Sequence, residues 1–220
     1  MGIAVIAGTP FDAELGASLL RDAGQAATPY PMAGSPDEQD ALQYERPDVL
    51  RTAFADLVRG LPARGHRVAM VFCNSLSAVV DRDVGAAGVV LVTPATVYRE
   101  VAAVHRNALV FTGNGSAVVG YERVVASAAH RSVVISDPVL VRAIETGDPD
   151  AAFRESALPG ALRLAERARM DAVVLACTHF TEVLPHVLAA CGLPVVDVGR
   201  RLVELTVAAA DAAPVDGRAA

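Results

Sequence analysis

The chain of 220 residues contains no lysine, and its 19 basic residues are all arginine. No side chain can therefore form the internal Schiff base that ordinary pyridoxal-phosphate enzymes use. A Walker-type phosphate-binding loop is also excluded, because its lysine is missing. The composition thus removes two large classes of enzyme before any motif is considered.

Aromatic residues and long apolar runs are scarce as well. Aromatics make up 5% of the chain, with no tryptophan, whereas 53% of the residues are hydrophobic, so the core must be built mainly from Ala, Val and Leu. No apolar run reaches the roughly 18 residues of a membrane span. The N-terminus lacks the basic start and cleavage region of a signal peptide. We therefore expect a cytoplasmic protein without a membrane partner.

Basic clusters and disulfide frameworks are absent too. With a net charge of −6 and no basic patch, the chain is not expected to bind nucleic acid. Three cysteines do not form a disulfide framework in a cytoplasmic chain of this size. The Cys177-x-His179 segment offers two metal ligands but no second spaced pair, so no metal site is predicted.

Short apolar runs alternate with Ala-, Leu- and Arg-rich segments of helical period, which predicts parallel sheets flanked by helices. The expected strands are residues 3–7, 68–72, 89–92, 108–112, 132–136, 172–176 and 195–198. The expected helices are residues 12–23, 48–61, 75–80, 95–105, 116–129, 138–145, 150–168, 180–191 and 199–212. Polar residues 31–47 predict a loop near a cleft mouth, and residues 213–220 predict a frayed tail.

The two halves of the chain resemble each other. An apolar strand followed by Cys73, two polar residues and a helix recurs later as a strand followed by Cys177, two polar residues and a helix. Upstream of each cysteine lies a strand with a Gly-containing turn, at Gly8 and at Gly113. This repeat predicts two similar three-layer α/β lobes related by a pseudo-twofold axis, with one cysteine on each wall of the cleft between them.

Both cysteines lie at the carboxyl end of a predicted strand, where open α/β sheets bind ligands. Each precedes a predicted helix, whose free N–H groups and dipole stabilise a thiolate. One cysteine in such a place is most simply a small buried side chain, whereas two in equivalent places indicate chemistry. We predict Cys73 and Cys177 as catalytic residues, with His179 holding or relaying a proton, and a structural role for Cys191.

The turns at the strand ends also offer donors for a substrate carboxylate. Backbone N–H, hydroxyl and amide groups can bind an anion there without a lysine, although Ser, Thr and Asn are also ordinary helix caps. The predicted substrate-binding residues are Gly8, Thr9, Asn74, Ser75, Thr112, Asn114 and Thr178.

These motifs resemble those of the aspartate/glutamate racemase superfamily over most of the chain. Val-Phe-Cys-Asn-Ser at 71–75 is similar to the family's first cysteine motif, C-N-T/S, and Leu-Ala-Cys-Thr-His-Phe at 175–180 is similar to the second, G-C-T-H-Y in glutamate racemases. More weakly, Pro29-Tyr30 resembles the P-Y pair of an early substrate loop. Residues 92–95 and 111–114 resemble the crossing into the second domain and the turn that opens it.

The resemblance implies a two-domain α/β fold, an acidic substrate between the domains and no cofactor. It also implies that one cysteine thiolate removes the α-hydrogen while the other thiol protonates the opposite face. The chain departs from glutamate racemases after the first strand, where they carry D-S-G with the Asp near the first cysteine. Here that turn is Ala7-Gly8-Thr9-Pro10, and the nearest carboxylate in sequence is Asp12.

We predict a cofactor-independent racemase of an acidic substrate, which is glutamate, aspartate or another acid, and a homodimer is a plausible assembly. Residues 1–93 with 196–220 are expected to form one lobe and residues 94–195 the other, with the strand at 195–198 returning to the first sheet. Two alternatives remain open. One is a one-cysteine decarboxylase or cis–trans isomerase of the same superfamily, and the other is a non-catalytic protein that binds an acid.

Overall fold

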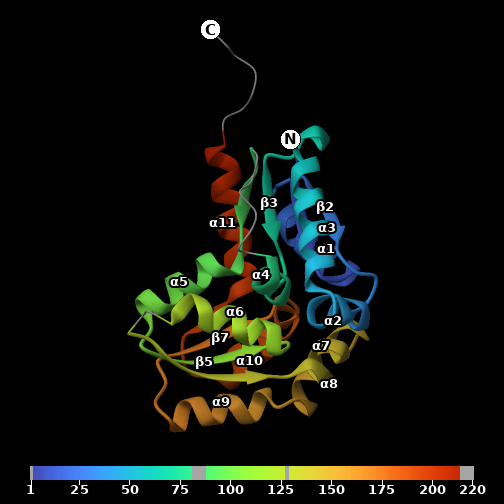
Figure 1. Cartoon of the computed structure of the whole chain (residues 1–220). Helices are drawn as coiled ribbons and strands as arrows, with labels where there is room; N and C mark the ends of the chain where they lie inside the picture. Colours follow the sequence, from blue (N-terminus) through green and yellow to red (C-terminus); the bar gives the residue numbers. More distant parts are fainter. Residues whose placement is uncertain (1, 81–87, 127–128, 214–220) are drawn as a thin grey trace.

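The computed structural model describes residues 2–80, 88–126 and 129–213 and shows two α/β lobes, one above the other (Figure 1). Each lobe contains a four-stranded parallel sheet, with the strand orders β2-β1-β3-β4 and β6-β5-β7-β8. The first sheet contains β1 (Ile3–Ala7), β2 (Ala27–Pro31), β3 (Val68–Val71) and β4 (Val90–Val92). The second contains β5 (Asn107–Thr112), β6 (Arg131–Ser136), β7 (Ala172–Ala176) and β8 (Val195–Asp197). The matching strand orders agree with the internal repeat, and the predicted two-lobed α/β fold is confirmed.

Helices flank both sheets. In the upper lobe of Figure 1 they include α1 (Pro10–Asp22), α2 (Pro36–Tyr44), α3 (Pro47–Gly60), the 3-10 turn η1 (Pro62–Arg64) and α4 (Asn74–Val80). The chain then continues through α5 (Pro94–Val104), α6 (Gly115–Val125), α7 (Pro138–Glu145), α8 (Pro149–Glu155) and α9 (Leu158–Arg167). The last elements are the 3-10 helix η2 (Thr178–Val183), α10 (Leu184–Ala190) and α11 (Val198–Ala212). None of the helices among the described residues is long and apolar enough to cross a membrane.

Alternate residues of each central strand pack on opposite faces of the sheet, as the pleat requires. In β1, Val5 packs with buried residues of α1 and α11, whereas Ile6 packs with Phe54 and its neighbours on α3. In β5, Val110 and Phe111 divide between two clusters in the same way. Helices therefore cover both faces of each sheet, which explains why these strands are almost entirely apolar.

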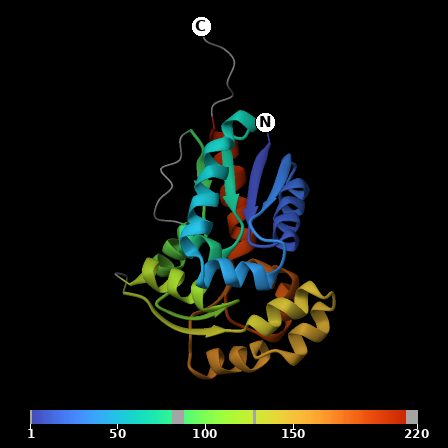
Figure 2. The ribbon, with the colours of Figure 1, turned by 45° about the vertical axis from the view of Figure 1, so that its right-hand side comes forward.

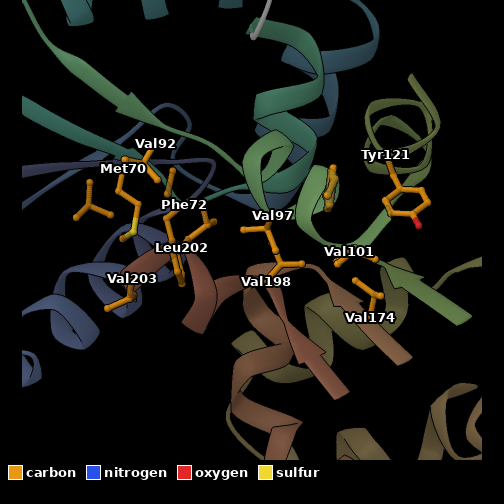
Figure 3. Close-up of a cluster of buried hydrophobic side chains, with 14 of the residues drawn as sticks. Met70, Phe72, Val92, Val97, Val101, Tyr121, Val174, Val198, Leu202 and Val203 are labelled. Carbon is orange, nitrogen blue, oxygen red and sulfur yellow. The ribbon is translucent and has the colours of Figure 1, made fainter. Parts of the chain in front are cut away.

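One hydrophobic cluster runs through both lobes. Figure 3 shows Met70 and Phe72 from the first lobe close to Leu202 of α11, and Val101 of α5 near Val174 of β7. All five side chains are fully buried or nearly so. This shared core fixes the lobes against each other and so sets the distance across the cleft between them.

The strand at the C-terminal end of the chain lies in the second sheet, so its expected place in the first sheet is wrong. Val195–Asp197 pairs with β7 in parallel, through partners Val173 to Leu175. Only the following helix crosses over: α11 packs against α1, β3 and β4 (red in Figure 2). The buried Asp197 begins that helix by accepting hydrogen bonds from the N–H groups of Gly199 and Arg200. The domain boundaries themselves stay a prediction.

Two of the expected helices are broken. The helix expected at 150–168 is interrupted at Ser156, whose extended backbone ends α8 and whose Oγ accepts the N–H of Leu158. Pro159 lacks an N–H and fits only the first turn of a helix, here that of α9. The helix expected at 180–191 is the 3-10 helix η2 followed by α10, and Pro185 lies in the first turn of α10.

The polar segment expected to be a loop is mostly helical, which is a second correction. Ser35 caps α2 by accepting the N–H of Glu38, with Pro36 in the first turn. The Ser-x-x-Glu spacing is the sequence signature of a capping box, so a signal for this helix was present. Strand β2 was also missed, because its prolines suit only an edge strand. Of the expected tail, residues 214–220 lie outside the described part of the chain, as do residues 127–128 of the expected helix 116–129.

Candidate active site

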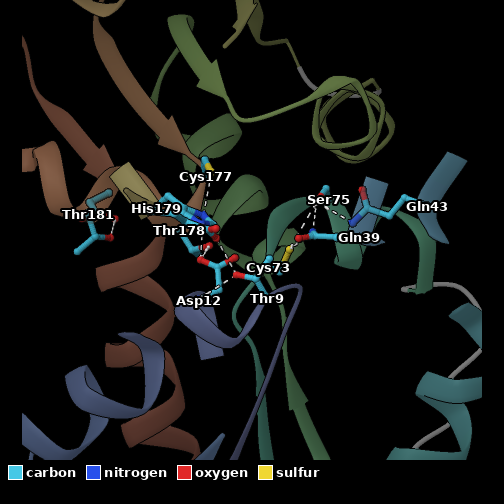
Figure 4. Close-up of polar contacts among 12 residues, drawn as sticks. Thr9, Asp12, Gln39, Gln43, Cys73, Ser75, Cys177, Thr178, His179 and Thr181 are labelled. Carbon is cyan, nitrogen blue, oxygen red and sulfur yellow. Dashed lines mark hydrogen bonds and ion pairs between the residues drawn. The ribbon is translucent and has the colours of Figure 1, made fainter. Parts of the chain in front are cut away.

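The carboxyl ends of the strands in the two sheets face each other, and both candidate cysteines lie between them (Figure 4). Cys73 follows β3 and Cys177 follows β7, and the exposed fractions of these residues are 4% and 8%. Both line one cavity whose walls come from the two lobes. Its free volume is about 40 Å³, enough for a few water molecules.

The backbone fixes where each thiol lies. At Cys73, the N–H of the preceding Phe72 donates to the carbonyl of Ile6 in the neighbouring strand β1. The carbonyl of Cys73 itself accepts the N–H of Ser77 in α4. On the second side, the carbonyl of Cys177 accepts the N–H of Phe180 in a tight 3-10 turn. The thiol of Cys177 therefore precedes a 3-10 helix rather than the expected α-helix, and its electrostatic support comes from side chains instead.

That support is the imidazole of His179. The side chain is buried, and its Nδ1 lies 3.9 Å from the Cys177 sulfur. Nδ1 also lies 3.0 Å from Oδ1 of Asp12, and Nε2 lies 2.8 Å from Oε1 of Glu145. The ring of Phe11 stacks on the imidazole with 5.3 Å between ring centres. His179 is thus held rigidly between two carboxylates, one from each lobe.

These carboxylates decide the charge of the imidazole. Burial alone would lower the pKa of His179, but the charge and hydrogen bond of Asp12 and the bond to Glu145 raise that pKa well above its ordinary value of 6.5. Partial burial would raise the pKa of Glu145, yet the hydrogen bonds from His179 and Thr9 lower it. At neutral pH the group is therefore an imidazolium between two carboxylates, and its positive charge lies beside Cys177.

The other thiol has the opposite environment. Burial, and then the negative charge of Asp12, raise the pKa of Cys73 to about 11. Hydrogen bonds from Ser75 and the backbone N–H of Leu76 offset this only in part. Cys73 is accordingly a thiol at neutral pH. The two cysteines therefore have different neighbours although they occupy equivalent strand ends: Cys177 lies beside His179, whereas Cys73 lies beside Ser75 and Gln39.

Several residues at this site were not recognised in the sequence. Glu145 is the last residue of α7, and its Oε1 contacts both His179 and Thr9. The hydroxyl of Thr9 donates to this oxygen at 2.9 Å. Gln39 and Gln43, both on α2, hydrogen-bond the hydroxyl of Ser75, and Gln39 also reaches the Cys73 sulfur. Asp12 was noted in the sequence, but without a role. All four side chains come from segments far from the cysteine motifs, so no local pattern could bring them to the site.

The predicted substrate-binding residues are placed unequally. Asn74, Ser75, Asn114 and Thr178 line the cavity, whereas Thr112 bonds to the backbone of Ile135 inside the sheet and is not part of the lining. Gly8 and Thr9 lie just behind the lining, with Thr9 capping α1. Their roles in binding a substrate stay predictions.

Several of these lining groups already have protein partners. The hydroxyl of Thr178 donates to Asp12 at 2.9 Å, and the side-chain Oδ1 of Asn114 accepts the N–H of Ala117 as a helix cap. Tyr30, which the resemblance placed in a substrate loop, bonds to His66 and does not line the cavity. Some of the predicted substrate-binding residues therefore cap helices or bond to other side chains in this structure.

Gly113 is expected to be essential for the position of the Cys177 thiol. A Cβ at this position would lie 2.8 Å from the Cys177 sulfur and 2.9 Å from a methyl of Val141, so Gly113→Ala must push the thiol aside. A displacement of about 1 Å at a catalytic group costs about 10²-fold in rate, and this is the loss expected if Cys177 acts as the sequence predicts. Gly115→Ala is the matched control, because its nearest neighbour would be the Tyr44 hydroxyl at an ordinary 3.5 Å. Steady-state kinetics showing equal rates for both variants would contradict the assigned geometry.

Glu145→Gln is expected to destabilise the protein only in a window of pH. The lowered pKa of Glu145 means that its carboxylate contributes stability above its ordinary pKa of 4.5 and loses it as the pH falls through the folded-state value. The raised pKa of His179 means that its contribution is complete below 6.5 and is lost as the pH rises through the folded-state value.

We therefore expect a loss of about 2 kcal/mol in unfolding free energy at roughly pH 5.5, as for a hydrogen bond between charged groups. The loss should shrink toward pH 3 and toward alkaline pH. Urea unfolding of both proteins across that range measures it. A difference that does not vary with pH would show that Glu145 and His179 do not form an ion pair.

The described residues contain no group of three His, Cys, Asp or Glu side chains arranged to hold a metal ion. The site instead combines two buried thiols, an imidazolium and several amide and hydroxyl groups. Such a set can transfer protons to and from a carbon atom held between the thiols.

Comparison with known proteins agrees with this picture. A sequence model of the family described as Asp/Glu/Hydantoin racemase matches residues 12–206. A comparison with curated proteins gave no significant match.

Several solved structures share the fold. Picrophilus torridus aspartate racemase is 16% identical with a TM-score of 0.74, covering 96% of this chain and 95% of that one. An aspartate racemase homologue from Pyrococcus horikoshii OT3 is 15% identical with a TM-score of 0.72, covering 96% and 99%. Glutamate racemase from Francisella tularensis subsp. tularensis SCHU S4, in complex with D-glutamate, is 13% identical with a TM-score of 0.66, covering 94% and 80%.

Proposed function

The chain belongs to the Asp/Glu/hydantoin racemase family, and we propose that it racemises an acidic amino acid by proton transfer between two thiols. Racemases are isomerases, so this proposal stays within the enzyme class of the family. The observation that carries the proposal is the pair of buried cysteines, Cys73 and Cys177, on opposite walls of one cavity with unlike electrostatic surroundings. No cofactor takes part.

Cys177 is the base of the resting enzyme in this proposal. The imidazolium of His179 lies 3.9 Å from its sulfur, so that a positive charge stands next to the negative sulfur that acts as the base. The thiolate takes the α-hydrogen as a proton, and the electron pair of the C–H bond stays on the α-carbon and its carboxylate. Cys73, a thiol with its pKa at about 11, then gives its proton to the opposite face.

One turnover leaves Cys177 as a thiol and Cys73 as a thiolate. This is the state that the reverse reaction needs, so the enzyme can act on the product enantiomer without a separate step. Cys73 must therefore carry negative charge transiently despite its burial. The groups that contact its sulfur are therefore important, because they decide whether this negative charge can form.

Asn74 is proposed to hold the substrate's ammonium group. It is nine-tenths buried or more and lines the cavity; its Nδ2 donates to the Tyr98 hydroxyl, whereas its Oδ1 is buried without a partner among the described residues. A buried acceptor without a donor is costly, and an ammonium between the thiols would satisfy it. The carboxylates of the substrate are assigned to Ser75, Asn114 and the guanidinium of Arg142, which line the same cavity.

Asn74→Ala is expected to raise KM by roughly tenfold to a hundredfold, the loss of one hydrogen bond to a charged group, with a smaller effect on kcat. Ser77→Ala is the control, since Ser77 is buried on the same helix α4 but does not line this cavity. Initial rates over a range of substrate concentrations give both constants. An unchanged KM for Asn74→Ala would leave its amide as a structural group.

One observation favours a second candidate. The two thiols differ in environment, so Cys177 alone could act as the base or nucleophile of a decarboxylase or cis–trans isomerase, with Cys73 as a bystander. In that case the Cys73→Ala variant would keep its activity.

Incubating the protein with pooled L-amino acids and analysing the products by chiral chromatography separates these functions. We expect D-glutamate or D-aspartate to accumulate, and the individual acids then identify the substrate. Absence of any D-product, together with binding of a dicarboxylate by calorimetry, would instead indicate a binding protein.

A further inference from the structure

The helix α2 brings a side chain to the first cysteine that the sequence motifs do not contain. Nε2 of Gln39 lies 3.2 Å from the Cys73 sulfur and 3.1 Å from the Ser75 hydroxyl (Figure 4). We propose that Gln39 is a catalytic residue that stabilises the Cys73 thiolate and occupies the place of the carboxylate in the D-S-G turn of glutamate racemases. This inference rests on the proposed proton transfer between the two cysteines.

The glycine at position 8 supports this substitution in space. Gly8 belongs to the turn Ala7-Gly8-Thr9-Pro10 after the first strand, the turn in which glutamate racemases carry D-S-G. A Cβ built on Gly8 would collide with the Gln39 carboxamide, with its carbon as well as with its oxygen and nitrogen. The volume that a side chain at position 8 would need is therefore already filled by Gln39. Only one of the two groups can lie beside Cys73, and this chain carries the amide.

The helix that carries Gln39 is tied to both lobes. Gln43, one turn later, donates to the Ser75 hydroxyl at 2.9 Å. Across the cleft, Arg142 of α7 contacts Asp37 at 2.7 Å, and the Tyr44 hydroxyl accepts the N–H of Ser116 at 3.2 Å. In Figure 1, α2 accordingly lies directly beside α7. The amide of Gln39 is thus positioned by contacts from both walls of the site.

An amide and a carboxylate act differently on a neighbouring thiol. A carboxylate can only accept a hydrogen bond when ionised, and its charge would oppose the formation of a thiolate. The amide N–H donates to the sulfur and carries no charge, so its bond becomes stronger when the sulfur is negative. Asp12 already places a negative charge near Cys73. A neutral donor is therefore the group that lets Cys73 lose its proton in the turnover.

The test uses the thiol itself and needs no substrate. In the Cys177→Ser/Cys191→Ser background, Cys73 is the sole remaining cysteine of the chain, and its alkylation by iodoacetamide at pH 9 is proportional to its thiolate fraction. We expect Gln39→Leu to slow alkylation by roughly tenfold to a hundredfold, the effect of one hydrogen bond to a charged group. Gln39→Glu should slow it further, because a carboxylate then faces the sulfur.

Two more variants control for accessibility and folding. Gln25→Leu, in the turn after α1 and away from the cavity lining, should alkylate at the parent rate. Gly8→Ala should slow alkylation as Gln39→Leu does, because the added Cβ displaces the amide while leaving it in the sequence. If Gln39→Leu alkylates as fast as the parent or faster, the inference is overturned, whatever the amino-acid screen shows. If the screen fails while Gln39→Leu slows alkylation, the proposed substrate is wrong and the role of Gln39 stands.

Discussion

Replacing either Cys73 or Cys177 by alanine is expected to abolish racemisation, with a loss on the order of 10³–10⁴-fold in kcat. Inversion at the α-carbon needs a base on one face and an acid on the other, and each positioned proton-transfer group contributes about 10²–10⁴-fold. Removing one thiol leaves a face without a partner, so water must take its place in a cavity that holds only about 40 Å³.

Cys191→Ala is the matched control for these variants. Cys191 is the third cysteine, partly exposed and packed at the edge of the second core away from the cavity lining, so its loss should leave the rate within about twofold of the parent enzyme. Rates are measured with purified enantiomers in both directions. Full activity in Cys73→Ala alone would support the one-cysteine reaction instead.

His179→Gln is expected to have the second largest effect, a fall in kcat of roughly 10²-fold or more. The variant removes the positive charge beside Cys177 and leaves Asp12 as a buried carboxylate without its ion-pair partner. Uncompensated buried charges cost about 3–5 kcal/mol, so the unfolding free energy should also fall. The two effects have different causes and can be separated.

The double variant Asp12→Asn/His179→Gln separates them. It removes the unpaired carboxylate, so stability should recover in large part, whereas activity should stay low because the imidazolium is still absent. Denaturant unfolding and kinetics on the same three proteins measure both quantities. Recovery of activity together with stability would mean that His179 only holds the fold and does not act on Cys177.

The sequence predicted the sheets well because their strands are apolar on both faces and short. Seven of the eight strands, β2 being the exception, lie within a residue or two of the expected ranges. The cysteines were found for a related reason, since the ends of buried strands are the places where a polar motif stands out. The cavity between the lobes was predicted from their repetition.

The parts that could not be predicted depend on contacts between distant segments. Gln39, Asp12 and Glu145 belong to α2, α1 and α7, and each is an ordinary polar residue of a helix in the sequence. Their place in the site follows only from their contacts with Cys73 and His179, which the fold brings to them from distant segments. Likewise the pairing of β8 with β7 is decided by the short connection through η2 and α10, which places the strand beside its predecessor.

The central claim is that Cys73 and Cys177 address opposite faces of the same α-carbon. The most direct test is solvent deuterium incorporation at that carbon, measured separately for the L and D enantiomers with Cys73→Ala and Cys177→Ala. Each variant keeps one thiol and should exchange the α-hydrogen of only one enantiomer, the opposite one in the two variants, without racemising either. If both variants exchange the same enantiomer, or if either racemises at the parent rate, the two thiols do not lie on opposite faces and the account is wrong.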